Sequence, residues 1–324
     1  MNRSIQIIFI VICTFIFLPA SCAWAVLGEV LISEGAGEDL CSVVSQNLTS
    51  IVNAFEADDL TTQKSSFTTE GYDLAKDLLL KVPMSNARRT HKTKLLKLPR
   101  GGYEVRDIKV KVEMGDTPGN PNQYLVFELT EEGLISDLRF AIEATHYKRI
   151  VEEGERLQDF ARRQQILQTV EIFRTAYNRK DLDYLKRVYS DDALIIVGRV
   201  LKPRKDLPDM LEQSSLSRDK IEFIRLSKQE YMTNLGRCFE KNAFVKVVFD
   251  SVEVTRHNGD PDLYGVTVKQ NWYSSSYSDT GWVFLLWDFK DEKNPTIYVR
   301  SWQPEPFEDG SVINLYEFKI VRSN

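Results

Sequence analysis

The chain has 324 residues with 42 basic and 47 acidic side chains, and its net charge is −5. This mild acidity provides no broad positive surface, so nucleic acid is excluded as an expected partner. Without an N-terminal leader, roughly 300 residues remain, enough for about two domains that each bury a core.

The first 25 residues predict a signal peptide. Arg3 precedes the apolar run Ile5–Leu18, and Ala23 and Ala25 fit the small-residue rule for cleavage. The run is shorter than the ~20 residues that span a membrane, so we expect no transmembrane helix in the mature chain. The protein is therefore expected to be exported, to a periplasm or outside the cell. Lipid attachment through Cys22 is the alternative.

Two cysteines follow the leader, Cys41 and Cys238. Two cysteines do not make a disulfide framework, so a free buried thiol is the expected state of each. A bridge between the two halves of the chain is the alternative.

Two segments of the chain match at an offset of 122 residues, 48–71 and 170–193. The aligned pairs are Ala54 with Ala176, Phe55 with Tyr177, Asp59 with Asp181, Leu60 with Leu182, and Phe67 with Tyr189. Matching at this distance predicts a repeat of domain size.

Each copy begins with apolar residues at helical spacing and continues with strand-like segments. The expected strands are 103–114, 123–129 and 135–144 after the first copy, and 193–200, 243–257, 264–273, 282–289 and 296–302 after the second. Helices followed by antiparallel strands predict an α+β architecture, twice over.

Between the copies, residues 146–178 carry an apolar stripe that only Gly154 interrupts. Its members are Ile150, Leu157, Phe160, Leu167, Val170 and Phe173. This pattern predicts one nearly continuous helix that joins the domains.

Residues 173–198, FRTAYNRKDLDYLKRVYSDDALIIVG, resemble the opening of the NTF2-like (SnoaL-like) superfamily. Residues 264–305 resemble secreted two-domain members of it from Bacteroides-like bacteria. The resemblance implies two cone domains, each a helical hairpin on a curved antiparallel sheet, joined by a long helix. Their expected extents are 38–147, divergent, and 148–324, including the linking helix.

The superfamily contains an isomerase with a carboxylate base and a Tyr-plus-carboxylic-acid oxyanion site. The resemblance places these groups at Val197, Phe173 and Leu285, with Ile51 replacing the tyrosine in the first copy. Apolar side chains cannot move a proton or stabilise an enolate, so no catalytic residue is predicted. A hydrolase or isomerase with non-standard catalytic groups is the alternative.

Other chemical motifs are weak. The serines in 274–278 predict a hairpin turn, and His257–Asp262 lacks the carboxylate spacing of a calcium loop. We therefore expect no metal and no cofactor.

The segment 282–289 is apolar on both of its alternating faces, so both should be covered. The convex face is predicted to be an interface, either with the first domain as an intrachain pseudo-dimer or with a second copy as a homodimer. The candidate cavity or interface residues are Trp272, Trp282, Trp287, Tyr298, Arg300 and Trp302, of which the last three are expected to share a face.

The segment 88–100 is basic and contains no acid. An anion contact through Arg88, Arg89, Lys92 and Lys94 is one interpretation, and a solvated edge strand is the other.

The sequence thus predicts a non-catalytic extracytoplasmic binding or scaffold protein that uses a cone cavity or a sheet interface. Its expected partner is a small apolar or glycan ligand, or another protein.

Overall fold

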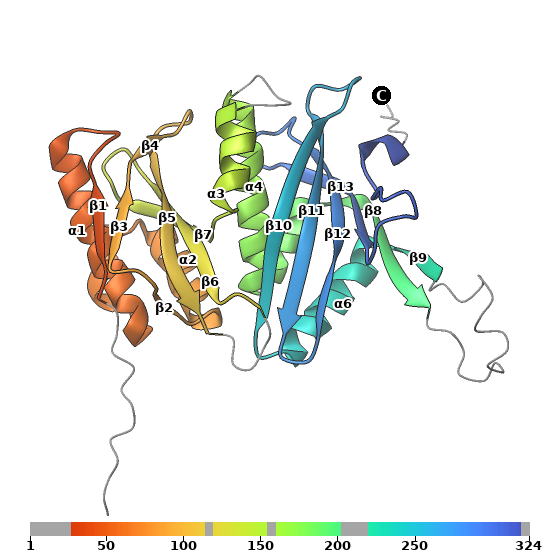
Figure 1. Cartoon of the computed structure of the whole chain (residues 1–324), viewed down its shortest axis with the longest axis horizontal. Coiled ribbons are helices and arrows are strands. Elements are labelled where there is room, and N and C mark those ends of the chain that lie inside the picture. Colours follow the sequence, from red (N-terminus) through yellow and green to blue (C-terminus); the bar gives the residue numbers. More distant parts are fainter. Residues whose placement is uncertain (1–26, 114–118, 154–159, 202–219, 319–324) are drawn as a thin grey trace, which may run out of the picture.

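The computed structural model describes residues 27–113, 119–153, 160–201 and 220–318 (Figure 1). The predicted signal peptide and Cys22 lie outside these residues. Within them, no helix is both long enough and apolar enough to cross a membrane. The prediction of a mixed helix-and-sheet fold is confirmed, with one sheet in each half of the chain.

The first sheet has the strand order β2-β5-β6-β7, with β4 paired to β5, and every pairing in it is antiparallel. A parallel pair, β1 with β3, lies beside it. The elements of this half are β1 (Glu29–Ile32), α1 (Glu38–Ala54), η1 (Phe55–Ala57), η2 (Thr61–Ser66), α2 (Thr69–Lys81), β2 (Met84–Asn86), β3 (Thr90–Thr93), β4 (Leu96–Lys97), β5 (Tyr103–Val112), β6 (Asn122–Leu129) and β7 (Ile135–Phe140).

The second sheet has the order β10-β11-β12-β13-β8-β9, in which only the pairing of β13 with β8 is parallel. Its elements are α4 (Phe160–Asn178), α5 (Leu182–Val188), β8 (Tyr189–Leu201), β9 (Lys220–Leu226), α6 (Lys228–Lys241), β10 (Val245–Arg256), β11 (Leu263–Ser274), β12 (Ser278–Asp288), β13 (Thr296–Gln303) and the short η5 (Leu315–Glu317). A capping box formed by Ser227 and Glu230 begins α6, and the Asp181 carboxylate caps α5, so local sequence sets both starts.

The two halves share several features at the offset of 122 residues. Helix α1 (Glu38–Ala54) aligns at this offset with residues 160–176, which lie within α4 (Phe160–Asn178). In the first half, Phe67 follows η2 and pairs in parallel with Ile135 of β7. In the second half, Tyr189 follows α5 and pairs in parallel with Ile297 of β13.

The joint between the halves is a helical hairpin, so the predicted single linking helix is wrong. Helix α3 (Ala144–Tyr147) continues as a π-helix (Lys148–Glu153), and α4 begins at Phe160. Arg163 Nε donates a hydrogen bond to the Val151 carbonyl at 3.0 Å. Residues twelve apart in one helix would lie about 18 Å apart along its axis. The chain therefore reverses direction between Val151 and Arg163. Val151 and Ile166 are accordingly buried in the same core.

Helix α4 lies between the two sheets, beside β10 on one side and β7 on the other (Figure 1). Every residue from Arg163 to Asn178 is buried except Gln168 and Ile172. Its apolar side chains, Val170 and Phe173 among them, belong to the core of the second half. Its Glu171 carboxylate contacts the first sheet, whereas Arg162 at its start contacts Glu292 of the second half.

The second sheet buries apolar residues on both faces, as predicted for 282–289. Val283, Leu285 and Trp287 face α4, whereas Phe284 and Leu286 belong to a separate cluster on the convex face. The chain's own C-terminal segment covers that convex cluster with Ile313, Leu315 and Phe318. The Phe318 ring stacks on Phe284 with centroids 5.3 Å apart.

At Phe284 and Leu286 the cover is therefore the C-terminal segment and not the first domain, which contacts the second sheet at Tyr273 instead. Contact with a second copy stays a prediction. The segment after β13 carries apolar residues among polar ones, and its packing against the sheet was not recognised. Those few side chains cover the apolar cluster around Phe284 and Leu286.

Candidate functional site

The most heavily charged region of the interior lies where α4 meets the first sheet, centred on Glu171. This carboxylate is fully buried and accepts hydrogen bonds from Arg106 on β5 and from Arg139 on β7, the latter at 3.3 Å. It also accepts the Ile142 backbone N–H at 2.8 Å. One helix carboxylate thus ties together two strands of the other half.

Three further carboxylates complete this ion cluster. Glu104, Glu128 and Asp137 each lie 2.9 Å from a guanidinium nitrogen of Arg139. Arg106 also contacts Glu104, and its guanidinium stacks 4.1 Å from the centre of the Tyr147 ring. We call the six residues Glu104, Arg106, Glu128, Asp137, Arg139 and Glu171 the ion cluster.

Arg174 and Thr175 extend the contact along α4. Arg174 donates to the Ala141 carbonyl at 2.7 Å, to Gln123 and, on the other side, to the Val247 carbonyl of β10 at 2.9 Å. Thr175 Oγ1 accepts the Phe140 N–H at 2.9 Å. These bonds satisfy buried polar groups on both sides of the helix.

The electrostatics of the two glutamates differ. Burial by itself would raise the pKa of Glu171, but Arg106 and Arg139 outweigh it and hold that pKa below its usual value. For Glu128, burial dominates over the nearby Arg139 and raises the pKa of the carboxyl. Glu171 is therefore held in its ionised form, whereas the pKa of Glu128 is shifted in the opposite direction.

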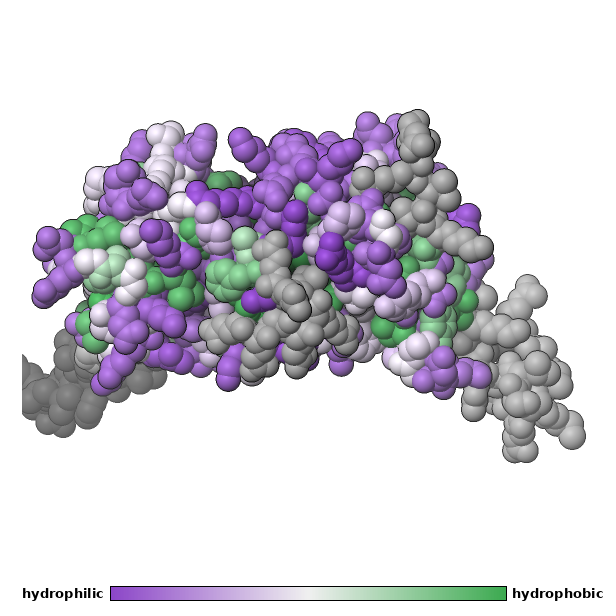
Figure 2. All heavy atoms as spheres, turned by 90° about the horizontal axis from the view of Figure 1, so that it is seen from above, coloured by the Kyte–Doolittle hydropathy of each residue, from purple (hydrophilic) through white to green (hydrophobic). Residues whose placement is uncertain are grey.

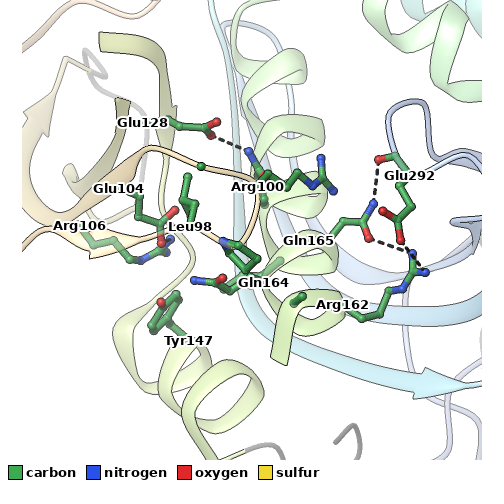
Figure 3. A pocket seen from close by; sticks show the side chains of 15 residues that line it. Leu98, Arg100, Glu104, Arg106, Glu128, Tyr147, Arg162, Gln164, Gln165 and Glu292 are labelled. Atoms are coloured by element: carbon green, nitrogen blue, oxygen red, sulfur yellow. Dashed lines mark hydrogen bonds and ion pairs between the residues drawn. The ribbon is translucent and has the colours of Figure 1, made fainter. Parts of the chain in front are cut away.

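A pocket of about 270 Å³ opens beside the ion cluster and is walled by both halves (Figure 3). The first half contributes Glu104, Arg106, Glu128 and the loop 98–101. The second half contributes Tyr147, residues of α4 from Ala161 to Gln168, and Glu292.

Most of the surface seen in Figure 2 is hydrophilic, with hydrophobic residues in separate patches.

A second polar group lies on the concave face of the second sheet. The Tyr177 hydroxyl is 2.8 Å from that of Tyr231 and 3.3 Å from that of Tyr189. The Arg300 guanidinium stands over the Tyr231 ring, 5.0 Å from its centre, and Arg300 is only 7% exposed. Burial raises the pKa of Tyr189 and Tyr231 well above the usual value, so both phenols stay protonated.

Among the described residues no carboxylate pairs with Arg300, whose side-chain hydrogen bond is with Tyr177, and its Nε has no hydrogen-bond partner there. Four more buried polar atoms of the same sheet also lack partners among those residues: Asp279 Oδ1, Trp287 Nε1, Ser301 Oγ and Gln303 Nε2. Burial raises the pKa of Asp279, although Tyr277 donates to its other oxygen at 2.7 Å. Each unsatisfied buried polar group costs about 1–3 kcal/mol, so such groups call for a functional explanation.

The predicted cavity and interface residues divide between these environments. Trp272 and Trp287 pack in the core on the concave face, against Tyr177 and Phe173, at ring-centre distances of 6.0 and 5.8 Å. Trp302 packs against the same core, and Trp282 lies half-buried on the opposite face by strand alternation.

Tyr298 does not share a face with Arg300 and Trp302, contrary to prediction. The pairing of β12 with β13 shifts at this point, where Trp287 pairs with Ile297 and Leu286 with Val299. Tyr298 is the extra residue of this β-bulge and is 42% exposed.

The basic segment lies around β3. Arg88, Arg89, Lys92 and Lys94 are all exposed, whereas His91 between them is buried and contacts Asn86 at 2.8 Å. An anion contact through the exposed side chains stays a prediction.

The positions of the isomerase groups are apolar packing sites: Phe173 and Leu285 are buried in one core, and Val197 packs against it. The serine segment forms the turn between β11 and β12, where Ser275 and Ser276 donate to Asn242 Oδ1 at 3.1 and 2.7 Å. In the described ranges, no cluster of His, Cys, Asp and Glu could hold a metal ion, and both Cys41 and Cys238 are free thiols.

Sequence reasoning did not identify the ion cluster or the pocket beside it. A signal was present, because Arg139 lies between Leu138 and Phe140 in an apolar strand and Glu171 lies in the apolar helix segment TVEIF. Charged residues are rarely buried unless they are paired, so opposite charges at apolar positions of two separate elements indicate a buried ion pair.

Comparisons with known proteins give similarity at the level of structure only. No protein family model matches the chain, and no curated protein matches it. An NTF2-like protein from Cytophaga hutchinsonii is 16% identical with a TM-score of 0.32, covering 44% of this chain and 97% of that one.

Two further solved structures match at similarly low values. A putative dehydratase of the NTF2-like family from Streptomyces avermitilis is 12% identical with a TM-score of 0.30, covering 44% of this chain and 94% of that one. Bd1075 from Bdellovibrio bacteriovorus is 12% identical with a TM-score of 0.33, covering 65% of this chain and 92% of that one. At these values the comparisons supply neither a ligand nor a reaction for this chain.

Proposed function

We propose that this protein is a non-catalytic, exported binding protein whose second half holds a small apolar ligand with an acidic group on the concave face of its sheet. The observation that carries the proposal is Arg300, a buried guanidinium without an ion pair among the described residues and with an unpartnered Nε. A buried charge is ordinarily paired, and an acidic group is the partner that a guanidinium recognises best.

The surroundings of Arg300 fit such a ligand. One hydroxyl of the Tyr177–Tyr231 pair can donate to an anion while the other donates within the pair, and the rings of Trp272 and Trp302 offer apolar surface in the same core. Among the residues named for this face, Asp279 is the one carboxylate. A single carboxylate without a partner base favours binding over the alternative of a hydrolase or isomerase.

The test compares phenylpropionate with its neutral counterpart phenylpropanol, and adds deoxycholate as a larger acid, by isothermal titration of the purified protein. We expect the acids to bind and the alcohol to bind at least ~tenfold more weakly, because the charge-assisted hydrogen bonds are lost. Arg300→Met should abolish this preference, whereas Arg225→Met, at an exposed arginine of β9, should not change it. Equal binding of acid and alcohol, or a preference that survives in Arg300→Met, would contradict the proposal.

A further inference from the structure

The pocket between the two halves is a second binding site with a different chemistry. We infer that it takes a small ligand bearing a primary ammonium group, held by the Glu128 carboxylate and the Gln164 side-chain carbonyl. This inference does not depend on the role of Arg300, because no residue of the concave tyrosine group lines the pocket.

The first argument is an unsatisfied acceptor. Gln164 is only 8% exposed and lines the pocket, and its Oε1 has no hydrogen-bond partner within the described ranges. Its neighbour Gln165 is satisfied at both ends, since its Nε2 donates to the Glu292 carbonyl at 2.8 Å and its Oε1 accepts from Arg162 at 2.9 Å (Figure 3). Gln164 therefore presents a buried acceptor to the pocket, and a ligand that donates would satisfy it.

The second argument is Glu128 Oε1, which takes part in no hydrogen bond among the described residues. Arg139 and Gln168 donate to this carboxylate at 2.9 and 2.6 Å, and both bonds go to Oε2. The side chain is 24% exposed and forms the part of the ion cluster that reaches the pocket wall. Its Oε1 is a second acceptor for a donor in the pocket.

The third argument is the balance of charge. The ion cluster has four carboxylates against the guanidinium groups of Arg106 and Arg139, and adding nearby Arg174 still leaves one carboxylate in excess. Of the other lining cations, Arg162 pairs with Glu292 at 3.1 Å, and Arg100 is exposed on its loop, where solvent screens its charge. A ligand with one positive charge would neutralise this excess negative charge beside the pocket.

An ammonium group meets all three conditions, because it carries one positive charge and three donors and accepts nothing. A divalent metal fits less well, since the cluster carboxylates already bind arginines, and no metal-ligand cluster occurs in the part of the chain described. A volume of about 270 Å³ lies just below the roughly 300–1,000 Å³ of typical ligand pockets, so a small amine is the expected ligand.

The experiment titrates the purified protein with two amines, cadaverine and glucosamine, and with their neutral counterparts, pentanediol and glucose. We expect at least one amine to bind at millimolar concentration and its neutral counterpart not to bind. Glu128→Gln should weaken the amine at least ~tenfold, because it removes a charge-assisted hydrogen bond. Gln164→Met, of similar shape but without the acceptor, should also weaken it.

Asp137→Asn is the matched control. Like Glu128, Asp137 lies 2.9 Å from Arg139 Nη1 and is partly exposed, but it does not line the pocket. It removes the same excess charge but no group that lines the pocket, so it should weaken the amine clearly less than Glu128→Gln, and circular dichroism melting shows that each variant is folded. The inference is overturned if neither amine binds, if glucose or pentanediol binds as well as its amine, or if Asp137→Asn weakens binding as much as Glu128→Gln.

Discussion

Helix α1 and helix α4 occupy matching positions in the two halves, and each holds an extended segment against its outer side. On α1, Thr49 Oγ1 accepts the Val30 N–H at 2.9 Å, and Asn53 Oδ1 accepts the Gly28 N–H at 2.7 Å. Two side chains one helical turn apart thus accept hydrogen bonds from two backbone N–H groups, one in β1 and one in the residue before β1.

On α4, the residues 122 positions later, Glu171 and Thr175, also accept hydrogen bonds from the backbone of an extended segment. Glu171 accepts the Ile142 N–H at 2.8 Å, and Thr175 accepts the Phe140 N–H at 2.9 Å. The geometry of the helix and of the segment it holds is conserved between the halves, while the chemistry has changed from a neutral hydroxyl to a carboxylate.

The difference follows from what lies beyond the extended segment. β1 is a short strand with exposed residues on its outer side, so neutral acceptors suffice for α1. α4 faces a complete sheet that brings Arg106 and Arg139 to it, and these two cations can be buried only with a carboxylate. The comparison shows that the neighbour of a helix, and not its place in the fold, decides whether its outer side carries charge.

The largest expected effect comes from removing this charge. Glu171→Gln should lower the free energy of unfolding by about 3–5 kcal/mol, because Arg106 and Arg139 stay buried with less compensation. Thr49→Val at the matching position should cost about 1–2 kcal/mol for one lost neutral acceptor. Denaturant unfolding of both variants measures the two losses. Equal losses would mean that the carboxylate acts only as a hydrogen-bond acceptor.

A second contrast concerns what covers the other face of each sheet. The first sheet is covered by α4, whereas the convex face of the second is covered by the C-terminal segment around Leu315, which is 3% exposed. Leu315→Ala should therefore cost about 2–4 kcal/mol and increase the binding of a hydrophobic dye, since Phe284 and Leu286 lose their cover. Tyr316→Ala, at a neighbouring residue that is 75% exposed, serves as the control. A stable Leu315→Ala variant that binds no dye would show that the convex face does not need this segment.

The charge difference between α1 and α4 also predicts a difference in pH dependence. The folded-state pKa of Glu171 lies below its ordinary value of 4.5, so its contribution to stability is complete above that value. That contribution is lost as the pH falls through the lowered folded-state pKa. The stability gap between wild type and Glu171→Gln should therefore shrink in acid, whereas the gap for Thr49→Val should stay constant. Unfolding curves from neutral to acidic pH measure both gaps, and parallel behaviour would refute the prediction.

The smallest effect is expected just after the two helices. Asp58 and Lys180, also 122 residues apart, have positive φ angles of 50° and 57°, and each N–H donates to a carbonyl three residues earlier. Glycine adopts this conformation without strain, so Asp58→Gly should stabilise the protein by up to about 1 kcal/mol. Lys180→Gly should gain less, because it removes the bonds from Lys180 Nζ to the Asn242 and Ala243 carbonyls. Thermal melting distinguishes them, and a larger gain at Lys180 would contradict the comparison.

The sequence was sufficient to predict the fold class and the position of α4, because apolar periodicity is a local signal. It was not sufficient for the joint, since the stripe from Ile150 to Phe173 does not reveal that Val151 and Ile166 meet across a reversal. The sequence did not predict the ion cluster for a related reason. Arg106 and Arg139 precede Glu171 by 65 and 32 residues, and only the tertiary fold brings them together. A single glutamate in an apolar helix is equally compatible with a solvated face.

The position of α4 between the two sheets has a consequence for how the molecule opens. Its backbone amides can reach solvent only when one of the sheets detaches, so they should exchange with deuterium as slowly as any in the protein. The amides of α1, covered on the outside by the short β1 alone, can open locally and should exchange faster. Because one helix completes both interiors, loss of either sheet uncovers it, and the two halves should unfold together as one cooperative unit.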